Sequence, residues 1–439
     1  MNRTIFAFQM LAWAAVACVP GPASTQTADG LAPCVARLRG ELPQHGEVRA
    51  ETFDTYTRQA TDLRPVIEAA TRSQPEFRLS IWDYVARLAD AEREADGRVV
   101  LLREAQALAA IESRHGLDAT TAVAVFGVET DYGRVKGRYP VVDATLSQAC
   151  LDLGSRERKG HFFAALWLLQ EGFVERDTFR GSWAGAFGLT QFMPGTFVRY
   201  RDDGDGSGRP DIIGSVPDAL STTARYLAAL GWQPGLLWGW EVTVPADVAA
   251  TRNTWQGEHG CLALNQPAGR CLGLSRWAAL GVARTDGRPL TRDSTAALLM
   301  PAGADGPAWL VTRNFQALWQ YNRADAYALA IGLLANAMRG EPPMKAAWPT
   351  DDPGLSRAEL RELQGLLVRR GHADVSVDGA DGPRTRDAVA GEERALGLAG
   401  EGRPSMKILR RLRAEVTSSA PADAASAANP MKVHPVKSP

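Results

Sequence analysis

The chain has 439 residues, and at about 150 residues per domain this length predicts two or three folded units. Hydrophobic residues make up 45% of the chain and charged residues 23%, which is typical of soluble globular proteins and argues against fibrous, disordered and membrane-embedded classes. The 49 Lys and Arg residues nearly cancel the 50 Asp and Glu residues. The chain therefore lacks the positive field that recruits nucleic acid, and no nucleic-acid partner is expected.

The N-terminus has the pattern of an export signal. Arg3 precedes an apolar stretch from Ile5 to Val19, and a Pro/Gly segment of small residues follows. The stretch is shorter than the about 20 apolar residues that span a membrane, so residues 1–24 are predicted to be a signal peptide. Cys18 follows small residues, as at a lipoprotein cleavage site, but the usual Leu is missing. Cys18 is therefore either lipidated or removed with the signal, and both outcomes stay open.

Four other cysteines are present, and an even number fits an oxidising compartment. Cys261 and Cys271 are close in sequence and would close a loop that contains Gly and Pro. Cys34 and Cys150 would tie the mature N-terminus to the main body. The sequence contains no CxxC motif and no Cys/His cluster with zinc spacing, so these thiols are not expected to bind metal.

The body of the chain is predicted to be mainly helical. From residue 31 to 230, apolar residues recur three and four positions apart, which predicts helices. Between residues 240 and 309, short Val, Leu and Trp runs alternate with turn residues and predict a small, partly β subregion. Helical periodicity returns over 315–338. Together, residues 31–340 are expected to form one domain.

A second, smaller unit is predicted after residue 354. Residues 341–354 are rich in Pro, Asp and Ala and are predicted to be a linker. Ser356 and Glu359 then form a capping box before leucines at helical spacing. Residues 355–414 are therefore expected to form a compact helical module. Residues 415–439 have little apolar bulk and are predicted to be disordered.

One carboxylate stands at the end of a strongly apolar helix. Asp118 can cap a helix whose residues 121–128 are nearly all apolar, and Glu129 follows directly. Against apolar walls the charged form of a carboxyl is disfavoured and its pKa rises, as a general acid at neutral pH requires. The alternative is a helix-end Glu in a surface ion pair with Arg134 or Lys136. Glu129 is the candidate catalytic residue.

Residues 181–194 combine small residues with polar and aromatic side chains. Repeated Gly and Ala let the backbone approach another backbone or a ligand closely. Ser182 and Gln191 offer hydrogen bonds. Trp183 and Phe192 offer flat faces. This composition suits a saccharide groove, and a tight helix-packing segment is the alternative.

Taken together, three motifs resemble the lytic transglycosylase B family. They are Phe-Gly-Val-Glu-Thr-Asp-Tyr-Gly at 126–133, the Gly-Ser-Trp-Ala-Gly-Ala block that leads to Gln-Phe-Met-Pro, and Asn314-Phe315 followed by Tyr321-Asn322. The resemblance spans residues 34–338. It implies a mainly α, lysozyme-like catalytic domain of the periplasm, attached to the outer membrane if Cys18 carries lipid. The implied substrate is the glycan strand of peptidoglycan, cleaved at the MurNAc-β-1,4-GlcNAc bond with formation of 1,6-anhydro-MurNAc ends.

The resemblance also assigns roles to single residues. Glu129 would protonate the glycosidic oxygen and then, as a carboxylate, take the proton of the C6 hydroxyl. Asp131 is the candidate second carboxylate for a hydrolase, so a muramidase is the first alternative, and a non-catalytic wall-binding scaffold is the second. The family motifs place the following side chains at the substrate: Tyr84, Ser182, Gln191, Phe192, Tyr226, Tyr321, Asn322 and Tyr327. Each Tyr has the alternative of a core aromatic with a satisfied hydroxyl.

Two positions depart from the family pattern. Leu189 stands where the family usually has Gln, and Ala324 stands where a Ser is common. Both exchanges are expected to remove a polar group near the groove. They would affect substrate fit more than proton transfer, because Glu129 and Gln191 are retained.

An acidic segment has part of the EF-hand pattern. Oxygen donors that could hold Ca²⁺ are Asp203, Asp205, Ser207, the Arg209 carbonyl and, by resemblance to the family, Asp218. Gly214 occupies the twelfth position, where the regular loop has a bidentate Glu. The segment is either a structural Ca²⁺ site or an acidic surface turn. The chemistry itself is expected to need no cofactor.

Residues 355–412 resemble the small three-helix peptidoglycan-binding module of many wall enzymes. The motifs that carry this resemblance are Leu363-Gln364, Gly371, Asp378-Gly379 and Asp381-Gly382-Pro383-x-Thr385. The usual Phe-Gln at the end of the second helix is missing, and Glu392-Glu393 stand in that region. The fold of the module is therefore expected, whereas retained wall binding is less certain.

Overall fold

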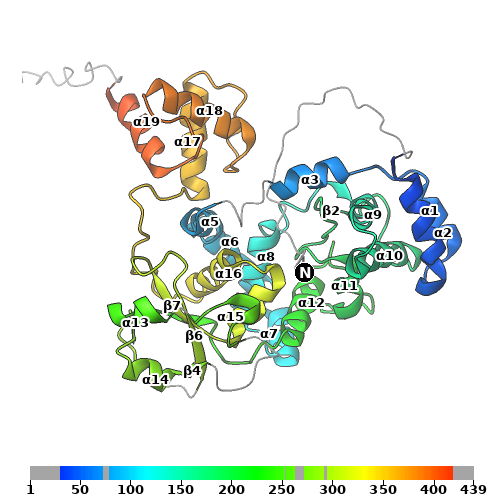
Figure 1. Cartoon of the computed structure of the whole chain (residues 1–439), viewed down its shortest axis with the longest axis horizontal. Coiled ribbons are helices and arrows are strands. Elements are labelled where there is room, and N and C mark those ends of the chain that lie inside the picture. The colour runs from blue at the N-terminus through cyan, green and yellow to red at the C-terminus, as the bar shows by residue number, and fades with distance from the viewer. Residues whose placement is uncertain (1–29, 73–78, 253, 263–270, 291–293, 419–439) are drawn as a thin grey trace, which may run out of the picture. The chain divides into compact units, whose positions relative to one another are not determined.

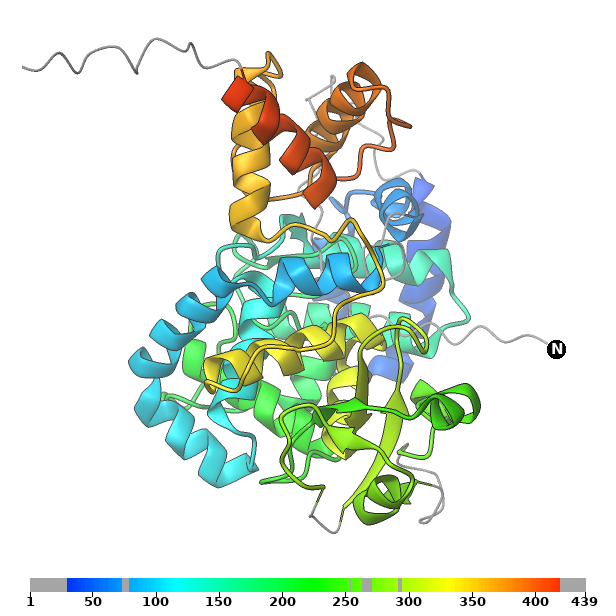
Figure 2. The ribbon, with the colours of Figure 1, turned by 90° about the vertical axis from the view of Figure 1, so that its left-hand side faces the viewer.

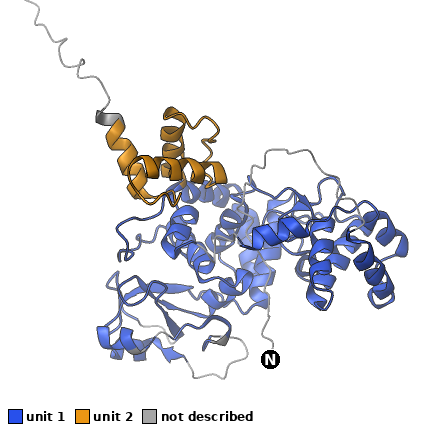
Figure 3. Cartoon of the chain, turned by 45° about the horizontal axis from the view of Figure 1, so that its top comes forward, with its two compact units in different colours: residues 1–356 blue, residues 357–439 orange. Residues whose placement is uncertain are grey.

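The structure is a computed structural model. It describes residues 30–72, 79–252, 254–262, 271–290 and 294–418. The chain divides into two compact units, residues 1–356 and 357–439, coloured separately in Figure 3. Both units are mainly helical and the first contains a small sheet, as the sequence predicts.

Some predictions fall outside the described residues. The predicted signal peptide (1–24) and Cys18 lie there, as does most of the predicted disordered tail. Helix α19 (Met406–Ser418) includes residues 415–418, so the helical part of the chain ends later than predicted. Among the helices in the described ranges, none is long and apolar enough to cross a bilayer.

The helical body of the first unit is formed by a series of mostly short helices, shown in Figure 1. They are α1 (Ala32–Glu41), η2 (Leu42–His45), α2 (Ala50–Thr57), α3 (Arg64–Arg72), α5 (Ile81–Leu88), α6 (Ala91–Arg103), α7 (Ala105–His115), α8 (Ala119–Thr130), α9 (Val141–Leu151), α10 (Arg156–Gln170), α11 (Pro194–Tyr200), α12 (Val216–Ala229), α15 (Arg313–Asn322) and α16 (Asp325–Met338). Several begin at side-chain caps, as where Ser80 accepts the Asp83 N–H and Asp90 accepts the Arg93 N–H.

Helix α8 is the central element of this body. It contacts α6, α7, α12 and α16, and all its residues from Thr121 to Thr130 are buried. A helix that is apolar all round has no solvent face, so it must be covered on every side. Asp118 caps it by accepting the Thr121 N–H at 3.0 Å, as the sequence predicts. The helix ends at Asp131, which has a φ of 50°.

The predicted partly β subregion is an antiparallel sheet with strand order β4-β6-β7-β3-β5. Its strands are β3 (Gly239–Thr243), β4 (Leu272–Gly273), β5 (Ala283–Arg284), β6 (Thr295–Leu299) and β7 (Ala308–Val311). Leu310 lies opposite Trp240 on one side and Leu298 on the other. The short helices α13 (Ala246–Thr251) and α14 (Leu274–Ala279), green in Figures 1 and 2, flank the strands. Trp277 of α14 is fully buried in this second core.

The segment predicted to be helical over 315–338 forms two helices, α15 and α16, with a break that the sequence did not predict. Arg323 adopts a φ of 51° and ends α15, and Ala324 is extended before α16 begins. The left-handed conformation costs a non-glycine residue about 1 kcal/mol or more. The break separates Asn322, the last residue of α15, from Tyr327 in the first turn of α16.

Two disulfides form with the pairing that the sequence suggested. Cys34 of α1 is bonded to Cys150 of α9, 116 residues away. Cys261 is bonded to Cys271 across a separation of 10 residues. The first bond joins the N-terminal helices to the central body, and the second closes a loop beside the sheet.

The predicted linker, residues 341–354, runs along the surface of the first unit. The backbone N–H groups of Lys345 and Ala346 donate to the Glu241 carboxylate. The Trp348 ring packs against Trp309 of β7. The segment is therefore held against the sheet region by both polar and apolar contacts.

The second unit contains α17 (Arg357–Arg369), α18 (Pro383–Ala395) and α19, the three helices that the sequence predicts. The buried Gln364 amide organises the turn between the first two. Its Nε2 donates to Asp378 Oδ1 at 3.0 Å, and its Oε1 accepts the Gly379 N–H at 2.8 Å. The Leu-Gln and Asp-Gly motifs are therefore in direct contact.

Glu392 of α18 is a buried carboxylate. It is 6% exposed and binds Arg370 at 2.8 Å and His372 at 2.9 Å. Burial alone would raise the pKa of Glu392, but the hydrogen bonds from Arg370 and His372 hold the pKa below its ordinary value. The buried charge of Glu392 is thus compensated by an ion-pair network.

Candidate active site

Glu129 lies inside the fold, in the last turn of α8, and is 6% exposed. The Tyr327 hydroxyl donates a hydrogen bond to Glu129 Oε1 at 2.5 Å. Arg134 binds Asp96 at 2.6 Å, and Lys136 Nζ donates to the Ile213 carbonyl at 3.3 Å. Glu129 is therefore buried, and the alternative hypothesis of a surface Glu is wrong.

The partner of Glu129 is a fully buried phenol. Burial raises the pKa of Tyr327 well above its ordinary value, and the nearby Glu129 carboxylate raises it further. Tyr327 therefore stays protonated at any physiological pH. It can act toward Glu129 as a hydrogen-bond donor and not as a base.

Aromatic rings from three elements form one wall of the site. Phe192 packs edge-on against Tyr226 of α12 and Tyr321 of α15, each at 5.7 Å between ring centroids. Tyr321 lies 6.1 Å from Tyr327. The Tyr321 hydroxyl donates to the Thr190 carbonyl at 2.8 Å, so Tyr321 has the environment of a core aromatic with a satisfied hydroxyl. Burial raises the pKa of Tyr226 well above its ordinary value.

Tyr84, the weakest of the sequence predictions, is also brought to this region. It lies on α5, which packs against α16, and it is 3% exposed. The structure therefore gathers Glu129 and the predicted tyrosines from elements far apart in the sequence.

The loop 181–194 is shaped by its own polar side chains. Ser182 Oγ accepts the backbone N–H groups of Ala184 at 3.2 Å and Ala186 at 3.1 Å. Gln191 Nε2 donates to the Gly188 carbonyl at 2.8 Å, and Gln191 itself has a φ of 51°. The hydrogen bonds that the sequence assigned to a ligand are thus made, at least in part, to the loop backbone.

Thr130 is a residue that the sequence reasoning missed. Its hydroxyl donates to the Leu189 carbonyl at 2.6 Å and accepts the Gly133 N–H at 3.1 Å. These bonds fasten the end of α8, next to Glu129, to the loop 181–194. Leu189 is 4% exposed, so its side chain takes part in the core rather than in an open surface. The sequence feature that could have indicated this contact is a Thr at the last position of a helix, followed by a turn that contains Gly.

Asp131 is held by arginines. Its Oδ1 lies 3.5 Å from Arg93 and 3.5 Å from Arg134. Arg93 is fully buried and also donates to the Arg87 carbonyl at 2.6 Å. The candidate second carboxylate therefore faces two positive charges.

Two residues next to the helix break have different environments. Asn322 is 6% exposed, and within the described structure no group accepts a hydrogen bond from its Nδ2. This amide can donate to a bound oxygen. Ala324 is the N-cap of α16, where no side chain caps the helix. The exchange of Ser for Ala at this position therefore removes a helix cap, and not only a groove contact as the sequence suggested.

The acidic segment brings three of the five predicted metal ligands together. Oxygen atoms of Asp203, Asp205 and Asp218 lie within 4.8 Å of one another. Ser207 Oγ donates to the Arg209 carbonyl at 3.3 Å on the same loop. These oxygen donors match the preference of a hard cation such as Ca²⁺.

The same carboxylates also hold the loop backbone. Asp203 accepts the N–H groups of Gly206 and Gly208, and Asp218 accepts those of Gly204 and Asp211. Burial raises the pKa of Asp218, although these hydrogen bonds partly offset the effect. The acidic-turn alternative therefore also has support from the geometry.

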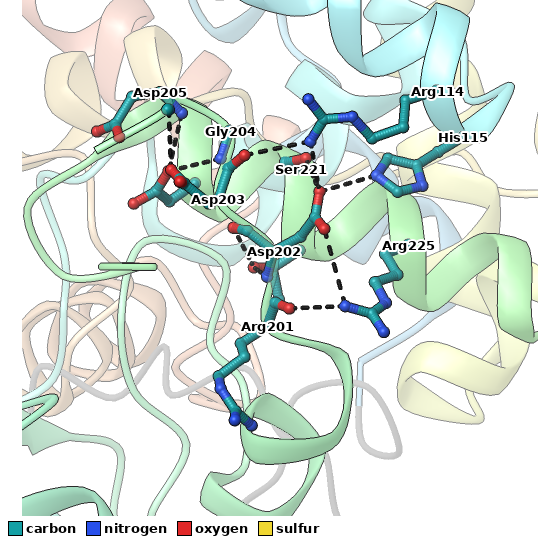
Figure 4. Close-up of polar contacts among 12 residues, drawn as sticks. Arg114, His115, Arg201, Asp202, Asp203, Gly204, Asp205, Ser221 and Arg225 are labelled. Carbon is teal, nitrogen blue, oxygen red and sulfur yellow. Dashed lines mark hydrogen bonds and ion pairs between the residues drawn. The ribbon is translucent and has the colours of Figure 1, made fainter. Parts of the chain in front are cut away.

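Asp202 anchors this loop to the helical body, and the sequence reasoning missed it. Figure 4 shows its carboxylate between α7 and α12, where it accepts hydrogen bonds from His115 at 2.9 Å and Ser221 at 2.5 Å. Arg114 and Arg225 lie on either side, at 3.1 Å and 3.7 Å. Burial would raise the pKa of Asp202, but the hydrogen bonds from Ser221 and His115 hold the pKa below its ordinary value.

Comparison with known proteins identifies relatives in sequence and in fold. Residues 30–336 match the family described as transglycosylase SLT domain. The chain is 30% identical over 231 residues to membrane-bound lytic murein transglycosylase B of Escherichia coli (strain K12). This match covers 51% of the chain and 58% of that relative, so the chain spans little more than half of the relative's length.

Two solved structures have a similar fold. SltB3 from Pseudomonas aeruginosa, in complex with NAG-NAM-pentapeptide, is 36% identical with a TM-score of 0.64, over 88% of this chain and 100% of that chain. Slt35 from Escherichia coli, in complex with calcium, is 23% identical with a TM-score of 0.58, over 70% of this chain and 93% of that chain. At that identity, Slt35 supports the fold alone. Since the family match covers more than half of the sequence, the chain belongs to the transglycosylase SLT domain family.

Proposed function

We propose that this protein is a lytic transglycosylase that cleaves the MurNAc-β-1,4-GlcNAc bond of peptidoglycan and leaves 1,6-anhydro-MurNAc ends. The observation that carries the proposal is the buried Glu129 carboxyl with a protonated phenol, Tyr327, at 2.5 Å from one of its oxygens. Membership of the SLT family, and relatives named as lytic transglycosylases, support the same assignment.

The geometry suggests how one carboxyl performs both proton transfers. The Tyr327 hydroxyl occupies Glu129 Oε1, so the proton to be transferred resides on Oε2. From Oε2 it passes to the glycosidic oxygen as the bond from that oxygen to C1 of the muramic sugar breaks. The N-acetyl carbonyl of the same sugar stabilises C1. The Glu129 carboxylate then removes the proton of the C6 hydroxyl, and the C6 oxygen bonds to C1.

Two groups are positioned to orient the muramic sugar. Asn322 Nδ2 is buried and available as a donor, which suits the N-acetyl oxygen. The partly exposed Tyr226 ring, supported edge-on by the fully buried Phe192, offers an aromatic surface of the kind that packs against sugar faces. Ser182 and Gln191 contribute by fixing the loop that carries Phe192. Correct positioning of the C6 hydroxyl over C1 favours the internal reaction.

The environment of Asp131 favours this reaction over hydrolysis. A hydrolase needs a second carboxylate to activate water or to attack C1. Asp131, the neighbouring carboxylate, faces the guanidinium groups of Arg93 and Arg134. Both ion pairs engage Asp131 Oδ1, so this carboxylate is held by protein side chains rather than directed at a water molecule or at C1. The muramidase alternative therefore has less support.

The mass of the released fragments tests the proposed reaction. Purified protein and purified peptidoglycan are expected to yield muramic ends that are one water lighter than hydrolysed ends, because the C6 hydroxyl replaces water as the nucleophile. Mass spectrometry of the soluble fragments measures this difference. Digestion of the same peptidoglycan by a hydrolytic muramidase is the control, and fragments with hydrated ends from this protein would contradict the proposal.

We propose that Asp203, Asp205, Ser207, Asp218 and the Arg209 carbonyl hold a structural Ca²⁺ ion. The ion would bridge the loop to the start of α12 and supply no step of the reaction. Ca²⁺ at a hundredfold excess over its Kd is expected to stabilise the protein by about 2.7 kcal/mol. Thermal unfolding with Ca²⁺ and with EDTA measures the effect. Asp205→Asn should reduce it, and identical Tm values in both conditions would rule out the ion.

We propose that the protein is exported to the periplasm and that residues 357–418 bind peptidoglycan. The apolar stretch with Arg3 and the two disulfides support export. The Gln364 contacts that join the motif residues support a module of the wall-binding kind. A tethered module would raise the local enzyme concentration on an insoluble polymer.

A further inference from the structure

Two strained turns meet beside Glu129. The first follows α8, where Asp131 and Tyr132 have φ values of 50° and 56°. The second lies in the loop 181–194, where Gln191 has a φ of 51°. A left-handed backbone costs a residue with a side chain free energy, so it persists only where the surroundings impose it. The contacts that hold these turns therefore set the local geometry around Glu129.

The Thr130 hydroxyl is a contact that both turns share. It accepts the Gly133 N–H at 3.1 Å and so closes the first turn. It donates to the Leu189 carbonyl at 2.6 Å, 59 residues away, and so reaches the second. A hydroxyl has a single hydrogen to donate. The Phe126 carbonyl of the same helix is the more distant acceptor, at 3.5 Å. The hydroxyl therefore favours the tertiary bond over the bond within its own helix.

The acceptor of this tertiary bond is itself fixed. The Leu189 N–H donates to the Ile212 carbonyl at 2.8 Å, so both backbone groups of Leu189 are bonded across the fold. The Leu189 side chain lies against the first turn, since a Cβ added at Gly133 would come within 3.0 Å of Leu189 Cδ2. Thr130 is fully buried and Leu189 is 4% exposed, so the bond is shielded from bulk water. Such shielding strengthens a hydrogen bond electrostatically.

This bond connects the proposed acid to the loop beside it. Thr130 directly follows Glu129 in the last turn of α8. The loop 181–194 carries Phe192, which supports the Tyr226 ring edge-on. The distance from the Glu129 carboxyl to that aromatic surface therefore depends on how α8 is joined to the loop.

Another polar contact between the two turns is weaker. Gln191 Nε2 lies 3.5 Å from the Lys136 carbonyl and only 2.8 Å from the Gly188 carbonyl of its own loop. Hydrogen bonds weaken as the distance between donor and acceptor grows, so the Thr130 bond at 2.6 Å is the tighter connection.

We propose that Thr130 is a positioning residue for the reaction, whose hydroxyl sets the position of Glu129 relative to the loop 181–194. The proposal rests on the proposed function, since it takes Glu129 as the acid. The Thr130 hydroxyl is engaged by protein groups on both its donor and its acceptor side, so it acts through Glu129 and not on the sugar. It affects the rate of bond cleavage more than substrate binding.

The test measures kcat and KM separately on soluble, uncross-linked glycan strands prepared from peptidoglycan. Thr130→Val keeps the shape of the side chain and removes the hydroxyl. It is expected to lower kcat about 10- to 100-fold and to change KM by less than about twofold, because a displacement of about 1 Å at the acid slows the chemical step without removing a contact to the sugar. Thr130→Ser keeps the hydroxyl and should give a kcat within about threefold of the wild-type value.

Thr57→Val is the matched control. The Thr57 hydroxyl is also buried and also donates to a backbone carbonyl, that of Phe53 at 2.8 Å, but it lies on α2. Its loss should lower stability and leave kcat unchanged. Thermal unfolding followed by circular dichroism gives an assay temperature at which the variants are folded. If Thr130→Val does not fold, Thr130→Ala takes its place, with the same expected result.

A folded variant without the Thr130 hydroxyl but with wild-type kcat would overturn the proposal. A rise in KM at unchanged kcat would also overturn it, as would a loss of kcat that is equally large in Thr130→Ser. Each of these results leaves the proposed function intact, provided that the wild-type protein releases anhydro ends. A wild-type protein that releases no fragments would instead overturn the proposed function and this inference with it. The two failures are therefore distinguishable.

Discussion

Glu129→Gln is expected to reduce strand cleavage by about 10³-fold or more while the protein stays folded. Glu129 is the proposed source and acceptor of the transferred proton, and general acid–base groups contribute about 10²- to 10⁴-fold each. Gln has the same shape, and its amide oxygen can still accept the Tyr327 hydrogen bond that Oε1 accepts now. The amide cannot donate a proton to the glycosidic oxygen. The loss should therefore appear in kcat rather than in substrate binding.

Fragment release from purified peptidoglycan measures the effect. Glu112→Gln, which makes the same exchange at an exposed position of α7, is the matched control and should retain wild-type activity. Retention of more than about a tenth of the activity by Glu129→Gln would contradict the assignment of Glu129 as the acid. Absence of release by the wild-type protein would instead favour the scaffold alternative.

The environment of Glu129 was predictable because its signals are local. Asp118, the apolar run and Glu129 are adjacent in sequence, so the pattern indicates a carboxyl at the end of a buried helix, although a surface ion pair remained the alternative until the fold was known. The hydrogen-bond partner of this carboxyl could not be predicted from local sequence. Tyr327 is 198 residues away, and no spacing rule connects the two positions. The family resemblance placed Tyr327 at the substrate, but only the fold brings its hydroxyl to Glu129 Oε1.

The helix break at Arg323 was missed because the sequence carries no breaker there. Arg and Ala are good helix formers, and apolar residues recur with helical spacing on both sides. Tertiary contacts decide the conformation instead. Tyr321 bonds to Thr190, and Tyr327 bonds to Glu129, and these contacts offset the cost of the left-handed residue.

Polar side chains in the loops were also hard to assign from the sequence. Ser182 and Gln191 were predicted to contact a ligand, yet their side chains bond to backbone groups within five residues. Local side-chain to backbone bonds of this kind compete with any ligand role. The structural role of Asp202 was missed for a different reason, the distance of its partners along the sequence. Its partners His115 and Ser221 are 87 and 19 residues away, so no local pattern marks it as an anchor.

Removal of the Cys34–Cys150 disulfide is expected to lower the free energy of unfolding of the first unit by about 5 kcal/mol. In the chain-entropy model, a disulfide limits the conformations of the unfolded chain, and the effect grows with loop length, to about 4.7 kcal/mol for a 100-residue loop. The Cys34–Cys150 loop closes over 116 residues, and both cysteines lie in helices of the folded body. The bond therefore excludes many unfolded conformations in which α1 is separated from α9.

The Cys261–Cys271 disulfide is the matched control because it closes over only 10 residues. The same model predicts that its removal costs about 2 kcal/mol less than removal of the longer link. Paired Cys→Ser variants, unfolded in urea and followed by tryptophan fluorescence, measure both losses. Every Trp of the chain precedes residue 357, so the signal reports the first unit alone. An equal or larger loss for the short loop would show that native contacts around each bond, rather than the entropy of the unfolded chain, determine their contribution.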